Sequence, residues 1–423
     1  MPKDQFIVAL DIGSSKICCV VASAEKGKMS VIGTHTVKSQ GMKDGVVNNI
    51  DKAVSAISEV LNKTEMMSGH PISRVAVTIS GTHIESFNSR GVVAVSGPNS
   101  EITTDDIVRV NEAAQAMSLP SSREIIHVLP REYIVDKQRG ISDPTGMTGV
   151  RLEVEANIIH GGAASLKNLT KCIHQVGVDI DQIIYAGYAA AEVVLTDTEK
   201  ELGTILIDMG GDTMDLIIYN GGRPVFSGVL PVGGQDITND LAIGLRSLLE
   251  DAEKVKLRYS SDYDRNEDNL IITKEGQETK IPRGEMYVGD LNIGMETVPI
   301  NLVSDIINRR LEEAFKFVKI YIKKSGFADK LPAGVVLTGG AGQTKGIEKI
   351  AEDIFKLPVR VAKPKNMSGL ADQIRDTSYS AVIGTLQVVS SSMQEDTKFY
   401  GKRKTDFGKM GGGVISFIKS FLP

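Results

Sequence analysis

The chain has 423 residues, of which 41% are hydrophobic and 24% are charged. This length exceeds one ordinary core, so we expect two or more domains, and the composition is normal for a soluble globular protein. The formal net charge of −5 argues against a nucleic-acid binder, because it implies no broad basic surface. No apolar run approaches the roughly 20 residues that span a bilayer, and the amino-terminal MPKDQFIVALDIG becomes polar too early for a signal peptide.

The cysteines and histidines indicate neither disulfides nor a metal site. Cys18, Cys19 and Cys172 are an odd set, and the first two are adjacent in an apolar stretch. We expect them to be small buried side chains in a reducing compartment. The histidines are scattered and no CxxC or HExxH motif occurs, so a metal site built from protein ligands alone is not indicated.

The first predicted elements form a pattern that returns in the second half of the chain. Residues 7–20 read IVALDIGSSKICCV and residues 204–217 read TILIDMGGDTMDLI, so that Asp11 aligns with Asp208 and Gly13 with Gly210. Each copy is a strand, an Asp-x-Gly turn and a second strand, which predicts a β-hairpin. Two such hairpins, each at the start of one half, predict duplicated α/β domains that face each other across a cleft.

Both hairpin turns have the composition of a phosphate site. A glycine-rich turn directs backbone N–H groups into a concavity that suits an anion. Asp11 and Asp208, at the strand ends, would hold Mg²⁺ mostly through water, as that ion prefers. One such turn is more often an ordinary hairpin, and it is the pair in register that favours phosphate. The expected phosphate ligands are Gly13, Ser14, Ser15 and Lys16 in the first turn and Gly210, Gly211, Asp212 and Thr213 in the second.

A long segment follows the predicted strand at 75–81 and predicts a compact α+β insertion. It contains no motif for chemistry, so an interaction role is more plausible than a catalytic one, and a spacer that only packs is the alternative. Its predicted elements are a β segment at 91–98, a capped helix with Asp in its first turn at 103–119, strands within 123–141 and a loop at 142–149.

The second half contains a glycine pair followed by two predicted helices. Gly233 and Gly234 in PVGGQDITNDLA precede the first helix, and we expect this pair to belong to the nucleotide-binding residues of the same cleft. The second helix, LLEDAEKVKLRYS at 248–260, carries Glu253 and Lys256 on one face. Such a face is just as often a solvated charged surface.

Another glycine pair lies further along, in VVLTGGAGQTKGI at 335–347. This stretch predicts a strand, then Gly339 and Gly340, then a helix, where a nucleotide can lie against the backbone. It is neither a P-loop nor a dinucleotide fingerprint, because the order Thr344-Lys345-Gly346 fits neither pattern.

The segment from about 258 to 300 is strongly polar at first and then strand-like. It precedes DIINRRLEEAFKFVKIYIKKSG at 305–326, whose apolar spacing predicts an amphipathic helix with doubled basic residues. Doubled arginines are usually solvated surface.

The chain changes character near its end. The polar, glycine-rich stretch up to residue 413 predicts a flexible linker, and the basic residues there oppose the acidic remainder of the chain. Residues 414–423, VISFIKSFLP, have helical apolar spacing, and about 15 Å of helix is half the roughly 30 Å hydrocarbon thickness of a bilayer. We expect this helix to lie in the surface of an anionic membrane; docking on the protein's own core is the alternative. The expected membrane-binding residues are Val414, Ile415, Phe417, Ile418, Lys419, Phe421 and Leu422.

The first turn, a small-residue helix, the second turn, the glycine pair at 339–340 and a second small-residue helix follow one another along the chain, and this order resembles the actin-like ATPase superfamily. The helices are YAGYAAAEVVL at 185–195 and SAVIGTLQVV at 380–389, whose small residues permit close packing at a hinge. The resemblance implies an α/β actin-like fold, with two duplicated domains around a nucleotide cleft. It also implies that Gly339 and Gly340 contact the adenosine and that Glu253 and Lys256 contact the ribose or adenine.

Within this superfamily the chain is most similar to the FtsA family of bacterial cell-division actins. The stretches 151–195 and 230–260 resemble that family, as does the ending in a variable linker and a short amphipathic helix. The resemblance implies binding of ATP and Mg²⁺, self-association into a polymer, and tethering of the FtsZ ring to the cytoplasmic face of the membrane at the division septum. The alternatives are an MreB-like or PilM-like protein, or a kinase or chaperone-type ATPase.

The resemblance also implies partner surfaces. The insertion at 84–165 would bind other division proteins, and the region 248–304 would help to receive the carboxyl-terminal peptide of FtsZ. The nearby basic or polar residues assigned to that peptide are Asn301, Ser304, Arg309 and Lys316.

Two positions depart from related proteins. In the heat-shock chaperone ATPases a glutamate lies three residues before the Ala-rich run of the first connecting helix, and here that position is Ala186. Asp215 is the remaining candidate to orient or deprotonate an attacking water, so we expect at most a slow ATPase and no metabolic reaction. Asp212 stands where many relatives have glycine, and a carboxylate facing phosphates is unfavourable unless it turns away or helps to hold Mg²⁺.

The expected organisation assigns the whole chain. The first actin-like domain comprises 1–83 and 166–200 around the insertion at 84–165, with a return helix at 380–392. The second comprises 201–247 and 305–379 around an insertion at 248–304, and the chain ends with a linker at 393–413 and the amphipathic helix at 414–423.

Overall fold

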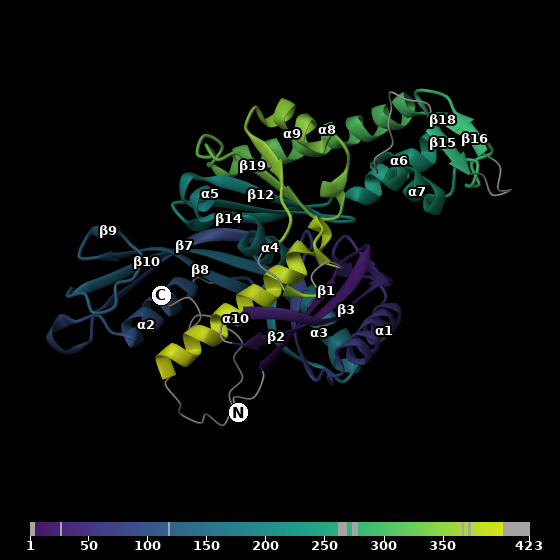
Figure 1. The fold of residues 1–423 in the computed structure, drawn as a ribbon. Coiled ribbons are helices and arrows are strands. Elements are labelled where there is room, and N and C mark those ends of the chain that lie inside the picture. The colour runs from purple at the N-terminus through teal and green to yellow at the C-terminus, as the bar shows by residue number, and fades with distance from the viewer. Residues whose placement is uncertain are drawn as a thin grey trace.

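The computed structural model describes residues 5–25, 28–116, 119–260, 269–272, 278–365, 368–370 and 374–400. Within them, the first domain contains a six-stranded sheet with the order β11-β6-β1-β2-β3-β21 (Figure 1). Strands β1 and β2 form the first predicted hairpin, and β6 pairs with β1 in parallel. The strands are β1 Gln5–Ile12, β2 Lys16–Glu25, β3 Lys28–Lys38, β6 Arg74–Ile79, β11 Asp179–Tyr185 and β21 Ser368–Gly369, and a separate hairpin contains β4 Met42–Lys43 and β5 Val46–Val47.

The second domain repeats this arrangement. Its sheet has the order β20-β19-β12-β13-β14-β7-β10-β8-β9, and the first five strands match β11-β6-β1-β2-β3 in order and in direction of pairing. The duplication expected from the sequence repeat is therefore confirmed. These strands are β12 Thr204–Met209, β13 Met214–Asn220, β14 Arg223–Leu230, β19 Val335–Thr338 and β20 Val359–Val361.

Helices cover the first sheet, and their apolar side chains pack with those of the sheet in one core. Helix α1 (Ile50–Ser68) begins after Asn49, whose side chain accepts a hydrogen bond from the Lys52 N–H, and it packs on β2 and β3 through residues such as Ile57. The other helices of this domain are α3 Ala163–Gln175, α4 Ala186–Val194 and α10 Ser380–Tyr400. Cys18, Cys19 and Cys172 are buried free thiols in this core, as expected.

The insertion folds as an α+β unit with its own small core, as expected. The Thr103 side chain and the Asp106 carboxylate cap the start of its helix reciprocally. Its strands continue the second domain's sheet rather than the first: Glu85 pairs with Gly228 of β14, and the Ser86 hydroxyl donates to the Ser227 carbonyl at 2.9 Å. The elements are β7 Glu85–Ala94, η1 Pro98–Ser100, α2 Thr104–Gln115, β8 Arg123–Val135, β9 Gln138–Ile141 and β10 Arg151–Gly162.

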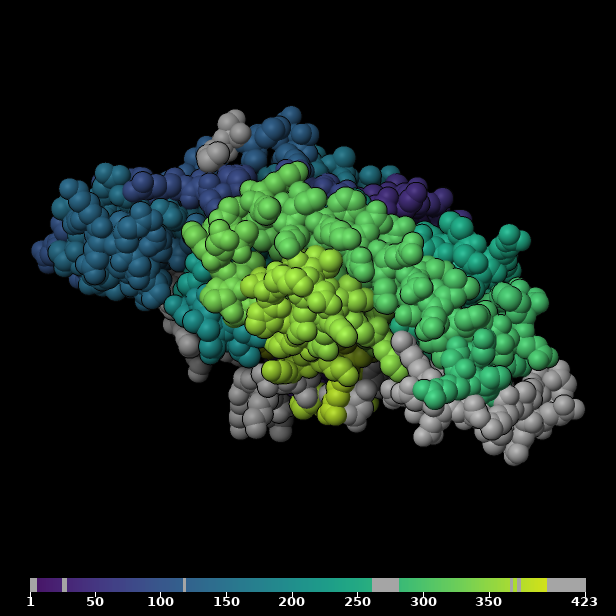
Figure 2. All heavy atoms as spheres, turned by 90° about the horizontal axis from the view of Figure 1, so that it is seen from above, coloured from purple at the N-terminus to yellow at the C-terminus, as the bar shows by residue number. Residues whose placement is uncertain are grey.

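The remaining elements complete the second domain, and Figure 2 shows the segment around residues 280–300 at the opposite end of the molecule from the insertion. The structure differs from the expected boundary at 304, because α8 already begins at Ile300. Ile300 and Val303 are buried and extend the apolar face of this helix by one turn. The elements are α5 Asp197–Leu202, α6 Gly234–Leu245, α7 Leu249–Ser260, β15 Asn269–Ile272, β16 Glu278–Ile281, β17 Glu285–Tyr287, β18 Thr297–Pro299, α8 Ile300–Ser325, η2 Ala341–Gln343, α9 Ile347–Phe355 and η4 Thr377–Tyr379.

The return helix α10 packs against α4 and is longer than expected. It continues to Tyr400, so the prediction of a linker from 393 to 400 is wrong. The stretch contains no Gly or Pro before Gly401, and a helix nucleated by packing propagates readily through such residues. The rest of the linker and the amphipathic helix at 414–423 lie outside the described residues. Among the described residues, no helix is long and apolar enough to cross a membrane.

Candidate functional site

A cavity of about 520 Å³ lies between the two domains, within the range of roughly 300–1,000 Å³ typical of ligand sites. Both hairpin turns, the 339–340 glycines and helix α7 line it. The sequence-predicted residues that line the cavity are Asp11, Gly13, Ser14, Ser15, Lys16, Asp208, Gly210, Gly211, Thr213, Asp215, Gly234, Glu253, Lys256, Gly339 and Gly340.

The two turns have equivalent backbone geometry. The Gly13 N–H donates to the Lys16 carbonyl at 3.1 Å, and the Gly210 N–H donates to the Thr213 carbonyl at 2.8 Å. The turns also approach each other closely, because a Cβ atom added at Gly211 would lie 2.8 Å from the Ser15 Cβ. The cavity is therefore lined by two matched sets of turn residues, one from each domain.

Three carboxylates converge beneath the turns. Burial raises the pKa of Asp11 to about 6, and burial together with the charge of Asp11 raises the pKa of Asp208 to about 7. Burial and the charge of Asp208 also raise the pKa of Asp215 well above its ordinary value. A divalent cation would offset this repulsion.

The carboxylates fit Mg²⁺ that keeps most of its water shell. Among the described residues, no group of three or more His, Cys, Asp and Glu side chains could hold a metal ion directly. Mg²⁺ commonly binds through one or two carboxylates and retains several waters. Asp11 and Asp208 are therefore suited to contact Mg²⁺ mostly through its waters.

Lys16 is positioned by the turn that precedes α10. Its ammonium donates to the Ser378 hydroxyl at 2.6 Å and lies 3.7 Å from the centre of the Tyr379 ring. The charge on Lys16 also lowers the pKa of Asp11 against the larger effect of burial. The one lysine of the first turn thus provides a cation at the cavity, held in place by the turn that precedes the return helix.

The Glu253 and Lys256 side chains are structural partners and not a solvated face. Their charged atoms are 2.6 Å apart. The Lys256 ammonium also donates to the Gly234 carbonyl at 3.0 Å and to the Thr238 hydroxyl at 2.9 Å. The pair fixes α7 to the start of α6, and both side chains line the cavity.

Asp215 is held by a residue that sequence reasoning missed. The Ser80 hydroxyl lies 2.9 and 2.7 Å from the two Asp215 carboxylate oxygens and 3.1 Å from the Thr213 hydroxyl. Ser80 follows β6 at the carboxyl end of a parallel strand, a common position for site residues in α/β sheets. Its place directly after a predicted strand is the sequence feature that could have identified Ser80 as a site residue. Ala186 also lines the cavity, at the position where the chaperone ATPases have glutamate, and Asp215 lines it as well.

Two predicted ligands do not line the cavity. The Asp212 carboxylate turns away and accepts a hydrogen bond at 3.0 Å from the Asp44 N–H of the first domain. Gly233 lies behind the second turn, where an added Cβ would be 2.2 Å from the Gly211 carbonyl oxygen. Neither residue therefore lines the cavity, although Asp212 belongs to the second turn and Gly233 packs against it.

The four residues assigned to the FtsZ peptide lie together on helix α8. Asn301, Arg309 and Lys316 are exposed and Ser304 is half-buried. Their spacing places them on one broad side of the helix. The neighbouring Arg310 differs, because its guanidinium makes two hydrogen bonds to the Asp240 carboxylate, at 2.6 and 2.9 Å.

Comparison with known proteins identifies the family. Residues 81–160 match the model described as the SHS2 domain inserted in FtsA, and residues 205–384 match the model for cell division protein FtsA. FtsA of Pseudomonas aeruginosa is 36% identical over 90% of this chain and 88% of that protein. For FtsA of Neisseria meningitidis the identity is 37%, over 99% and 98%, and for FtsA of Bacillus subtilis it is 35%, over 92% and 84%.

Solved structures with 14% sequence identity share the actin-like fold. A PilM–PilN type IV pilus biogenesis complex has a TM-score of 0.62 and covers 90% of this chain and 98% of its own. MreB5 of Spiroplasma citri bound to ADP has a TM-score of 0.52 and covers 94% and 100%. Likeness at this identity concerns the fold alone, whereas the sequence matches extend over nearly the whole chain. The chain belongs to the FtsA family of cell-division proteins.

Proposed function

We propose that this cell-division protein binds ATP with Mg²⁺ in the cavity between its two domains. The single observation that supports this most strongly is the pair of equivalent turns on opposite sides of one cavity of about 520 Å³. The N–H groups of the turns and the Lys16 ammonium would bind the phosphates. When bound, Mg²⁺ would neutralise phosphate charge, and Asp11 and Asp208 would hold it through its waters.

The adenosine would lie against Gly339 and Gly340, with the Glu253–Lys256 pair close to the ribose or adenine. Gly339 and Gly340 line the cavity next to η2, and the exposed Leu257 of α7 supplies an apolar surface at its mouth. A base that covered Leu257 would remove apolar area from water. This arrangement supports a nucleotide oriented with its phosphates toward the turns.

Hydrolysis, where it occurs, would be slow. Asp215 is buried, and Ser80 fixes its carboxylate, so it can orient a water. Burial and the neighbouring Asp208 raise the pKa of Asp215, which favours its neutral form over the carboxylate that would accept a proton. Asp215→Asn should retain ATP binding and abolish phosphate release; release at the wild-type rate would rule out Asp215 as the base.

Equilibrium binding of a fluorescent ATP analogue tests the nucleotide site. Lys16→Ala removes a charge-assisted contact worth about 1.5–3 kcal/mol, so affinity should fall about ten- to a hundredfold. Lys63→Ala, on the exposed face of α1, is the matched control and should bind normally. Chelation of Mg²⁺ should also weaken binding. Equal affinity of the Lys16 and Lys63 variants would contradict the site.

We also propose that the chain tethers the FtsZ ring to the cytoplasmic face of the membrane through residues 414–423. The amphipathic pattern and basic flank of that segment support a peripheral anchor, and self-association would multiply a weak anchor by avidity. Vesicles containing anionic lipid should co-float with the intact chain and not with a chain lacking residues 411–423. Glu in place of Phe417 and Phe421 should have the same effect, and flotation of the truncated chain would refute the anchor.

The FtsZ carboxyl-terminal peptide would bind along α8, beside Arg309 and Lys316. These basic side chains are exposed, whereas Arg310 is committed to Asp240. Arg309→Glu should therefore weaken peptide binding without loss of fold. Lys324→Glu, in the last turn of the same helix, is a control of equal charge change. Unchanged peptide binding by Arg309→Glu would contradict the assignment of the FtsZ peptide to α8. The proposal that the insertion binds other division proteins does not depend on this result.

A further inference from the structure

The hairpin β4–β5 is a short arm of the first domain. Its turn residues Asp44 and Gly45 have φ values of 51° and 78°. Two successive positive φ values define a type I′ turn, for which Asp-Gly is a preferred sequence. The hairpin conformation is therefore specified locally, by the residues of the turn itself.

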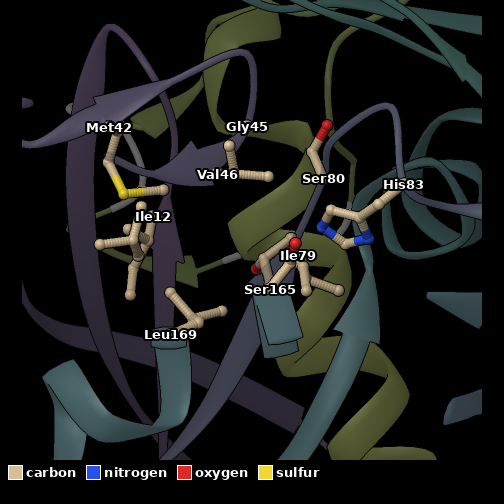
Figure 3. Close-up of a pocket in the computed structure, with 11 residues that line it drawn as sticks. Ile12, Met42, Gly45, Val46, Ile79, Ser80, His83, Ser165 and Leu169 are labelled. Atoms are coloured by element: carbon tan, nitrogen blue, oxygen red, sulfur yellow. The ribbon is translucent and has the colours of Figure 1, made fainter. Parts of the chain in front are cut away.

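Two contacts fix this arm to the first domain. The Gly45 N–H donates to the Ser14 hydroxyl at 3.0 Å, in the first phosphate turn. A Cβ atom at Gly45 would lie 2.6 Å from the Gly81 Cα, so the turn rests directly on the loop after β6. Figure 3 shows Met42, Gly45 and Val46 on one side of a small cavity, with Ser80 and His83 on another side. At about 10 Å³, that cavity is about the minimum size for a single water.

The tip of the arm reaches the second domain. The Asp44 N–H donates to the Asp212 carboxylate at 3.0 Å. This bond crosses between the halves of the molecule, yet neither residue lines the nucleotide cavity. Close by, Ser80 of the first domain bonds to Asp215 of the second. The two domains are thus joined by direct hydrogen bonds next to the phosphate turns as well as through any ligand.

We propose that the Asp44 N–H and the Asp212 carboxylate form an interdomain latch that slows the release of the bound nucleotide. This inference rests on the proposed nucleotide site. It assigns a role to Asp212, whose charge would be unfavourable if it faced the phosphates. Because the carboxylate points to a backbone donor outside the cavity, Asp212 acts as a positioning residue that holds the second turn against the first.

The consequence is a specific change in dissociation kinetics. A ligand enclosed between two turns leaves only when the turns separate, and separation must break the latch. One hydrogen bond to a charged acceptor that is partly exposed corresponds to about a fivefold change in rate. Loss of the latch should therefore raise the nucleotide dissociation rate about fivefold and leave phosphate contacts unaltered.

Stopped-flow dissociation of a fluorescent ATP analogue from the full chain tests the latch. Asp212→Ala should release the analogue about fivefold faster than wild type. Asp212→Asn keeps an acceptor oxygen and should remain close to wild type. Asp44→Asn is the matched control, because the latch uses the backbone N–H of residue 44, and Asn tolerates a positive φ as Asp does. Thermal unfolding of each variant checks that it folds.

The outcomes separate the latch from other roles of Asp212. If Asp212→Ala and Asp212→Asn both bind ATP more tightly, Asp212 repels phosphate and the latch is wrong. If both lose Mg²⁺ dependence, Asp212 contacts the ion and the latch is equally wrong. Amide hydrogen exchange at Asp44 in the nucleotide-free chain gives a readout independent of ATP: Asp212→Ala should raise it severalfold. Exchange at Asp44 that rises in Asp212→Ala would verify the hydrogen bond between Asp44 and Asp212. If the wild-type chain nevertheless binds no nucleotide, the proposed function is wrong, and the role of the latch in nucleotide release is wrong with it.

Discussion

Alanine at Gly339 should damage both stability and the nucleotide site. A Cβ atom there would lie 2.3 Å from the Asp208 Oδ1 and 2.4 Å from the Met209 carbonyl oxygen, and φ is +87°. The left-handed backbone costs about 1–2 kcal/mol for a residue with a Cβ, and the overpacking costs about 1–3 kcal/mol more. We therefore expect Gly339→Ala to lose about 2–5 kcal/mol of unfolding free energy in urea. It should also bind ATP·Mg²⁺ more weakly, because Asp208 must shift.

Gly346→Ala is the matched control for this prediction. Gly346 also has a positive φ, of +81°, but a Cβ atom added there would meet nothing within 4 Å beyond its chain neighbours. It should lose only the backbone contribution, about 1–2 kcal/mol, and retain normal ATP binding. If urea titration showed equal losses for the two variants, the crowding at Asp208 would be absent and the described geometry of the site would be wrong.

Three further predictions concern different parts of the molecule. Burial lowers the pKa of His127 from 6.5 to about 3, so between these pH values the unfolded chain binds more protons than the folded chain. The free energy of unfolding should therefore fall as the pH drops from 6.5 toward 3. In urea titrations across this range, His127→Gln should show a shallower fall. The chain has no tryptophan, so Tyr379→Trp adds a single reporter whose emission should change with ATP·Mg²⁺ as phosphate draws Lys16 away; a spectrum insensitive to ATP would contradict this. Arg310→Ala should lose about 1 kcal/mol of unfolding free energy through its ion pair with Asp240, and an unchanged urea midpoint would show that the pair contributes nothing.

Short sequence patterns were sufficient to predict the two hairpins that form the site. The hairpins around Asp11 and Asp208 are encoded by adjacent residues, and their repetition in the sequence predicted the duplicated sheets. The expected phosphate ligands could be named from the same residues, because the sequence of a four-residue turn determines where its own backbone N–H groups point. Helix α2 was predicted for the same reason: its capping residues, Thr103 and Asp106, lie three positions apart.

Contacts between distant segments could not be predicted in this way. Ser80 meets Asp215 across 135 positions, and Asp44 meets Asp212 across 168. No local periodicity carries that information, so Asp212 was assigned to phosphate. The pairing of Glu85 with β14 of the other domain was missed for the same reason. The polar composition after 392 suggested a linker, whereas packing of the preceding turns of α10 on α4 extends the helix to residue 400.

The most direct test of the proposed nucleotide function is an experimental structure of the full chain with ATP and Mg²⁺. We expect the phosphates to lie between residues 13–16 and 210–213, the metal waters to contact Asp11 and Asp208, and the Asp212 carboxylate to remain on the Asp44 N–H. A nucleotide bound elsewhere, or a cleft that stays empty at saturating ATP, would contradict the proposed function.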